Sequence, residues 1–100
     1  MATVHAMLCT VSGRAATGAS LPTPDSALVA SETLAAGATS LASTVSAQPG
    51  MVWRLTVRGG DAWAAFAPAP DASAADRWLL PPGVWDFHAT RAAEKVAVMA

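Results

Sequence analysis

The sequence predicts an all-β fold: a single small antiparallel β-sandwich or jelly-roll-like domain with an extended N-terminal arm or loop at residues 12–24. Apolar and polar side chains alternate with a period of two after position 50, which is the pattern of half-buried strands. Gly and Pro pairs then recur at the spacing typical of sandwiches and jelly rolls. A chain of 100 residues corresponds to one domain, residues 1–100.

The clearest predicted strand covers residues 51–58. Its apolar side chains occupy every second position, and Arg54, Thr56 and Arg58 lie between them. Gly59 and Gly60 follow, a dipeptide suited to the positive φ angles of a tight turn. We therefore predict a β-hairpin formed by residues 51–58 and 61–67. The side chains expected to face the core from the first strand are Met51, Trp53, Leu55 and Val57.

Three further strands are expected after this hairpin, so the best-defined strands lie within residues 51–99. Prolines at 68 and 70 mark an irregular connection, since proline cannot donate to a ladder. A short strand at 77–80 is followed by a turn at Pro81-Pro82-Gly83. Alternation resumes at 85–90, and the apolar segment 95–99 predicts a final strand.

The N-terminal half carries weaker signals. Residues 3–11 alternate as a strand, and residues 12–24 contain two Gly, two Pro and mostly small side chains, which indicates a long loop or arm. Residues 26–34 are open to two interpretations. Ser26 could cap a helix that ends at Gly37, but the apolar positions make a poor helical stripe, so we favour a strand. Residues 40–46 could form another strand.

Composition limits the classes of partner. Net charge is −1 and charged residues make up 13% of the chain, about half the usual share. Two arginines on one strand face, Arg54 and Arg58, are too few to neutralise a nucleic-acid backbone, so no nucleic-acid binding is expected. A surface with so few charged residues suggests that partners cover part of it. An Ala-rich genome explains it equally well, because 25 residues are Ala and the chain lacks Ile, Asn and Tyr.

No catalytic, cofactor or metal constellation is present, and we expect no enzyme. Cys9 is the only cysteine, and His5 and His88 have no partner at metal-ligand spacing. Asp86 and His88 would share a strand face, but no candidate nucleophile accompanies them. The longest uncharged stretch, residues 33–53, contains Gly, Pro, Gln and many Ser and Thr, so no membrane span is expected.

Four tryptophans are many for 100 residues. Trp53 lies on the apolar face of its strand and is expected in the core. The other three lie near turns and proline-containing loops, where an aromatic ring either joins the core or anchors an interface. Trp78, close to the Pro81-Pro82 turn, is the best single candidate for an intersubunit anchor. The full set of candidate interface residues is Trp78, Pro81, Pro82, Trp85 and Trp63.

The second half of the chain contains an alternating strand (53–57), a small-aromatic strand (62–66), a loop at 70–73, the turn Leu79-Leu80-Pro81-Pro82-Gly83, an aromatic strand (85–87) and the terminal Lys95-Val96-Ala97-Val98. In these features residues 45–100 resemble small virion proteins of tailed phages and of gene transfer agents, of the head decoration or head spike and fibre base type. The chain departs from the pattern at Ala67 and Glu94, where glycine is usual.

The resemblance implies a structural subunit that forms a homo-oligomer, a pentamer or a trimer, and attaches to the major capsid protein on the outside of a phage-like particle. In a spike base it would also hold a spike or fibre protein. Such a protein is made in the bacterial cytoplasm and binds neither nucleic acid nor membrane. Two alternatives stay open: a carbohydrate-binding β-sandwich module, and a component of the head–tail or tail connector.

Overall fold

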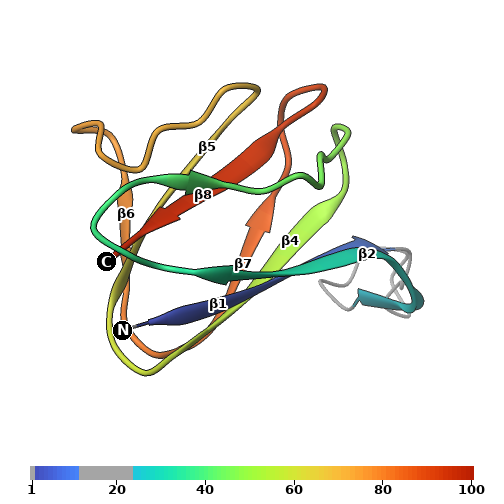
Figure 1. The fold of residues 1–100 in the computed structure, drawn as a ribbon. Coiled ribbons are helices and arrows are strands. Elements are labelled where there is room, and N and C mark those ends of the chain that lie inside the picture. The colour runs from blue at the N-terminus through green and yellow to red at the C-terminus, as the bar shows by residue number, and fades with distance from the viewer. Residues whose placement is uncertain (1, 12–23) are drawn as a thin grey trace.

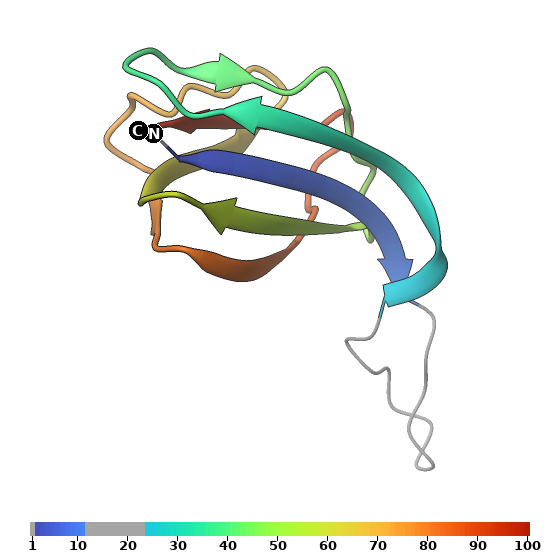
Figure 2. The same cartoon turned by 60° about the horizontal axis from the view of Figure 1, so that its bottom comes forward.

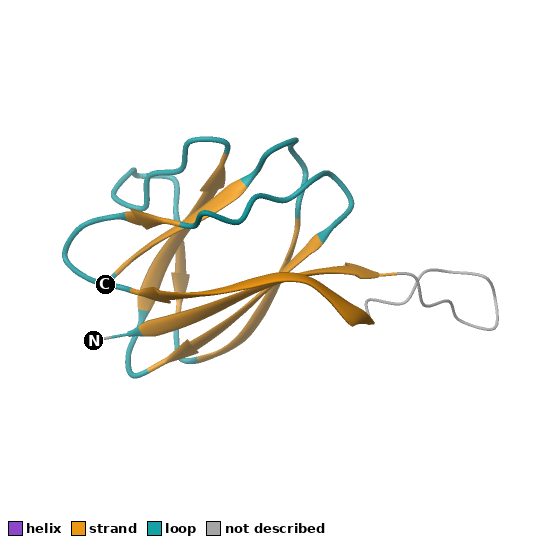
Figure 3. Ribbon diagram, turned by 45° about the vertical axis from the view of Figure 1, so that its right-hand side comes forward, coloured by secondary structure: helices purple, strands orange, loops and turns teal. Residues whose placement is uncertain are grey.

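The computed structural model describes residues 2–11 and 24–100, and these form two four-stranded sheets packed face to face (Figure 1). The described part contains strands and loops and no helix, so the predicted all-β sandwich is confirmed (Figure 3). The strands are β1 (Thr3–Val11), β2 (Pro24–Ala35), β3 (Leu41–Ala42), β4 (Val52–Arg58), β5 (Ala62–Ala67), β6 (Trp78–Leu80), β7 (Gly83–His88) and β8 (Lys95–Met99).

The first sheet has the order β2-β1-β4-β7 and the second has the order β3-β8-β5-β6, with every pair antiparallel. This is the strand order of a jelly roll in which the strand that usually comes last in the chain comes first, as β1. Both chain ends lie side by side (Figure 2). Ala36 N donates to Ala2 O at 2.9 Å, and Ala100 N donates to the neighbouring Gly37 O at 2.8 Å, so one turn holds both ends.

The N-terminal strands agree with the sequence in part. β1 has the predicted bounds, and the ambiguous segment 26–34 lies in a strand, β2, as favoured. β2 lacks the apolar stripe that a helix needs, and β1 pairs with it at residues 30–35 and again at Leu28 and Pro24. The strand expected within 40–46 is reduced to the two residues of β3. Of the predicted arm at 12–24, Pro24 begins β2 and residues 12–23 lie outside the described residues.

The predicted hairpin of residues 51–58 and 61–67 is wrong, although both strands exist. β4 pairs with β1 and β7 in the first sheet, whereas β5 pairs with β6 and β8 in the second. Gly59 and Gly60 have positive φ angles of 83° and 150°, as the turn requires, but the turn carries the chain from one sheet to the other. Alternation reveals which face of a strand is buried; it does not reveal which strand forms the hydrogen bonds.

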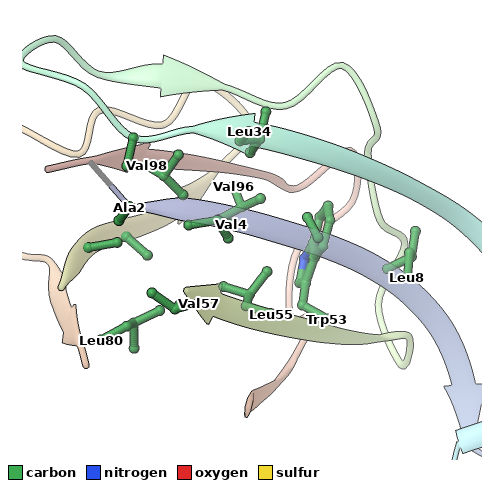
Figure 4. Close-up of a cluster of buried hydrophobic side chains, with 14 of the residues drawn as sticks. Ala2, Val4, Leu8, Leu34, Trp53, Leu55, Val57, Leu80, Val96 and Val98 are labelled. Atoms are coloured by element: carbon green, nitrogen blue, oxygen red, sulfur yellow. The ribbon is translucent and has the colours of Figure 1, made fainter. Parts of the chain in front are cut away.

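The core lies between the two sheets and contains the face predicted for residues 51–58 (Figure 4). Trp53, Leu55 and Val57 are buried, and Met51 packs against the cluster from its edge. Small residues fill the spaces between the larger ones. The remaining labelled members are Ala2, Val4, Leu8, Leu34, Leu80, Val96 and Val98, from four strands and the segment before β1.

The loop between β5 and β6, residues 68–77, crosses the outer face of the second sheet. Ala72 N donates to Ser40 Oγ at 2.9 Å, and Ser40 precedes β3, which lies beyond β8 as seen from β5. Beneath this path Ala65 and Ala97 are register partners that alternate with core residues, yet both are buried. Their small side chains let the loop lie close to the sheet. Part of the high alanine content therefore has a packing role.

Candidate interface and aromatic groove

Large apolar side chains are exposed at the corner where β6 runs into β7. We call residues 78–85 the β6–β7 corner. It holds four of the seven exposed large apolar side chains of the described residues: Trp78 (59% exposed), Leu79 (49%), Val84 (59%) and Trp85 (36%). The others, Leu28, Val29 and Leu41, lie on β2 and β3. Exposed apolar patches on small soluble proteins mark interaction sites, so this corner is the candidate interface.

The corner is exposed because both of its strands are sheet edges. β6 has three residues and pairs only with residues 62–64 of β5, and β7 pairs only with β4. The connection through Pro81 and Pro82 contributes no backbone donor. Trp85 Nε1 donates to Pro81 O at 2.8 Å, which fixes the indole against the connection. A Cβ built on Gly83, whose φ is 149°, would lie 3.7 Å from that Nε1.

The structure brings together four of the five residues singled out from the sequence. Trp78, Pro81, Pro82 and Trp85 all lie in the β6–β7 corner. Trp63 lies on β5 beside the corner, as the register partner of Leu79. The guanidinium carbon of Arg77 is 3.9 Å from the centre of its ring, so one face of Trp63 is covered.

Leu79 and Val84 are exposed members of the corner that sequence reasoning missed. Each is apolar on a strand next to a turn, which is the ordinary pattern of a core residue. Their exposure follows from the edge position of β6 and β7, and that position depends on pairing between distant strands. The nearby Pro81-Pro82 pair is the one sequence signal that could have found them.

A groove of about 300 Å³ opens beside the corner, where the short strand β6 leaves the two sheets uncovered. Three aromatic rings line it. The ring centre of Phe87 is 4.8 Å from that of Phe66 and 5.5 Å from that of Trp78. Phe66 in turn lies 6.3 Å from the ring of Trp53 in the core. A continuous run of aromatic rings therefore leads from the surface to the interior, and we call this site the aromatic groove.

Glu94 lies at the base of the aromatic groove and is 3% exposed. Its Oε1 accepts a hydrogen bond from Trp53 Nε1 at 3.2 Å, and its Oε2 accepts one from Thr90 N at 3.4 Å. Its backbone forms a two-way bridge with Ala47. In the sequence, Glu94 stands out only because glycine is usual at this position in the proteins it resembles. No pattern of neighbouring residues predicted that its side chain is buried.

The rim of the aromatic groove carries charges of both signs. Asp76 and Arg91 line it together with His88. Arg91 Nη1 donates to Phe66 O at 2.7 Å, so the guanidinium is held at the unpaired edge of β5 beyond the end of β6. Glu94 has no salt-bridge partner among the described residues. The groove therefore contains a buried carboxylate whose hydrogen-bond donors are both neutral.

Asp86 and His88 do not form the acid–base pair that their spacing allowed. Asp86 accepts two hydrogen bonds from Arg54, at 2.8 Å from Nε and 2.9 Å from Nη2. These bonds hold the pKa of Asp86 below its ordinary value and raise the pKa of Arg54. The carboxylate thus serves a cross-strand ion pair between β4 and β7 on the outer face of the first sheet.

The same outer face contains a shallow hollow of about 460 Å³ lined by β1, β2 and β4. His5 Nδ1 lies 3.1 Å from Thr33 Oγ1, and Thr56 and Arg58 line the opposite side. In residues 2–11 and 24–100, no three His, Cys, Asp or Glu side chains are grouped so as to hold a metal ion. No helix in this part of the chain is long and apolar enough to cross a membrane.

Comparison with protein-family models, with curated proteins and with solved structures finds no match for this chain.

Proposed function

We propose that this protein is a structural subunit of a phage-like particle, which forms a homo-oligomer and attaches to the particle's shell through the β6–β7 corner. The observation that carries the proposal is the exposure of Trp78, Leu79, Val84 and Trp85 within eight residues of chain. Trp is among the residues that contribute most to binding energy in protein interfaces. Burial of these side chains by another chain would remove a large apolar surface from water.

The backbone of the corner supports an assembly role as well. β7 is a six-residue edge strand, and its backbone groups on the side away from β4 have no strand partner in the described chain. Soluble proteins commonly protect such edges with lysine, proline or a covering loop. Here prolines lie only at the start of β7, and the side chains exposed along it include Val84 and Trp85. An edge of this kind fits pairing with a strand of another chain.

The particle itself is inferred from the resemblance over residues 45–100. Those residues include β4 to β8 and the whole corner. Jelly rolls occur in viral capsid proteins and also in lectins. The strand order therefore agrees with a role in a particle shell and equally with sugar binding. The unpaired strand edges and the exposed apolar side chains of the corner favour assembly with another chain.

The carbohydrate-binding alternative rests on exposed tryptophans. Trp78 and Trp85 are exposed, as sugar stacking needs, but the face of Trp63 is covered by Arg77. The three rings therefore do not offer one common platform. Glycan-array binding that disappears in Trp78→Ala would favour this alternative over assembly.

The test is the molar mass measured by light scattering during size-exclusion chromatography, across a range of protein concentrations. The wild-type chain is expected to form an oligomer of three or five copies. Val84→Lys places a charge on the exposed edge strand and is expected to give a monomer with an unchanged circular dichroism spectrum. Gln48→Lys adds the same charge at an exposed site outside the corner and should leave the oligomer intact.

A wild-type chain that stays monomeric at high concentration would overturn the proposal. So would a Val84→Lys variant with the same molar mass as the wild type, because self-association would then use another surface.

A further inference from the structure

We propose that the aromatic groove binds an organic cation, a small alkylammonium group, between its aromatic rings and Glu94. This site shares Trp78 with the β6–β7 corner but does not depend on the assembly role proposed above. Cations are attracted to the faces of Trp and Phe rings, and a nearby carboxylate adds a direct charge interaction. Phe66, Phe87 and Trp78 supply the rings, and Glu94 supplies the carboxylate.

Glu94 is a buried carboxylate with two long hydrogen bonds and no cation partner among the described residues. The residue is 3% exposed, and both of its carboxylate oxygens accept hydrogen bonds from N–H groups, at 3.2 and 3.4 Å. Both donors are neutral, and both distances are at or beyond the long end of the usual range. A buried carboxylate is normally matched by a cation or by short, charge-assisted hydrogen bonds. Glu94 has no cation partner among the described residues and its two hydrogen bonds are long, so a ligand cation would strengthen the environment of its carboxylate.

The groove is small and has a curved aromatic wall. Its volume of about 300 Å³ is at the small end of ligand pockets. The rings of Phe87, Phe66 and Trp78 are tilted against one another by 44° and 54°, so they form a curved wall and not a flat platform. A compact, rounded cation touches several rings of such a wall at once, whereas a flat sugar ring stacks best on one open face.

The lining of the groove contains more carboxylates than guanidinium groups. Asp76 and Glu94 contribute two carboxylates to the lining, against the single guanidinium of Arg91. That guanidinium is bonded to Phe66 O at 2.7 Å, which anchors it at the rim. The groove therefore favours a cation over an anion. A neutral saccharide is the competing ligand class and is included below as an outcome.

The experiment follows the indole N–H signals of the uniformly ¹⁵N-labelled protein by NMR. Trp53 Nε1 donates directly to Glu94, so its signal reports on that carboxylate without lying at the surface. The probe is tetramethylammonium chloride, with sodium chloride at equal ionic strength as the salt control. tert-Butanol serves as the neutral probe of similar shape, and methyl α-D-glucopyranoside as the saccharide. The titrations use both the wild type and Val84→Lys, so that assembly cannot hide the groove.

We expect saturable shifts of the Trp53 and Trp78 indole signals with tetramethylammonium, with a Kd on the order of millimolar. Glu94→Gln keeps an oxygen that can accept from Trp53 and should weaken binding about tenfold. Trp78→Ala removes one ring and should weaken it about fivefold. Trp85→Ala removes an exposed tryptophan outside the groove and should change the Kd by less than about twofold.

Equal shifts with tetramethylammonium and sodium chloride, or equal affinity in Glu94→Gln and the wild type, would overturn the proposal. Saturable binding of the glucoside alone would also overturn it and would assign the groove to a saccharide. If Glu94→Gln loses the dispersed spectrum of the folded protein, the Trp78→Ala and Trp85→Ala pair still decides the question, because both side chains lie at the exposed corner.

Discussion

Trp53 and Trp78 are the same residue type, yet they occupy opposite environments. Trp53 is fully buried on the central strand β4, with its indole N–H bonded to Glu94. Trp78 is 59% exposed on the edge strand β6 and contacts Phe87 at a ring distance of 5.5 Å. The short edge strand β6 leaves Trp78 exposed, whereas the central strand β4 has a neighbouring strand on each side and buries Trp53.

The largest expected effect is the difference in stability between Trp53→Ala and Trp78→Ala, which remove the same indole ring from two environments. Trp53→Ala should destabilise the fold by about 3–5 kcal/mol, because it opens a cavity in the core between the two sheets. A loss of this size is enough to unfold a small domain. Trp78→Ala should cost about 1 kcal/mol, the size of one lost aromatic contact. Urea unfolding of both variants in the Val84→Lys background, which is expected to be monomeric, measures the difference. Equal losses would show that the corner belongs to the core.

The next effect concerns the buried carboxylate that connects core and groove. Glu94→Ala leaves the buried indole N–H of Trp53 without an acceptor, and we expect a loss of about 1–3 kcal/mol. Glu94→Gln retains an acceptor and should lose less. The midpoint of urea unfolding is the measurement. A larger loss for Gln than for Ala would contradict the hydrogen bond to Trp53.

A smaller effect is expected at the turn that carries the chain from the first sheet to the second. Gly59 has a φ of 83°, a conformation that β-branched residues avoid. Gly59→Val should destabilise by about 1–3 kcal/mol through backbone strain. Gly37→Ala is a matched control, since a Cβ there meets nothing within 4 Å. An unchanged thermal midpoint for Gly59→Val would show that this backbone conformation is wrong.

The smallest effect belongs to the surface ion pair of β4 and β7. Arg54 holds the pKa of Asp86 below its ordinary value of 3.8, so the pair stabilises the folded state above that pH. This stabilisation begins to be lost as the pH falls below 3.8 and is gone once the pH is below the lowered pKa of Asp86 in the folded protein. Because both side chains are partly exposed, we expect at most about 1 kcal/mol. Comparing urea unfolding of the wild type and Asp86→Asn from pH 5 to pH 2.5 should show a gap that closes in acid.

Local patterns predicted the strands but not their partners. The alternation of Trp53, Leu55 and Val57 identified a buried face correctly, because that face is set by the chain's own period of two. The hairpin assigned to Gly59 and Gly60 failed because the partner of β4 is β1, more than forty residues earlier, and local sequence does not encode that pairing.

The candidate site was predictable to a similar extent. Pro81 and Pro82 drew attention to Trp78 and Trp85, and all four meet in one corner. The exposure of Leu79 and Val84, and the burial of Glu94 against Trp53, depend on edge positions and on a contact across 41 residues. The exposure of Leu79 and Val84 and the burial of Glu94 are therefore visible only once the strands are paired into sheets.

The most direct test of the corner as an assembly surface is hydroxyl-radical footprinting of the tryptophans in the wild type and in Val84→Lys. Trp78 and Trp85 are expected to be protected from oxidation in the wild-type oligomer and oxidised rapidly in the monomeric variant, while Trp53 stays protected in both. Equal oxidation of Trp78 and Trp85 in the two proteins would contradict burial of the β6–β7 corner by a second copy.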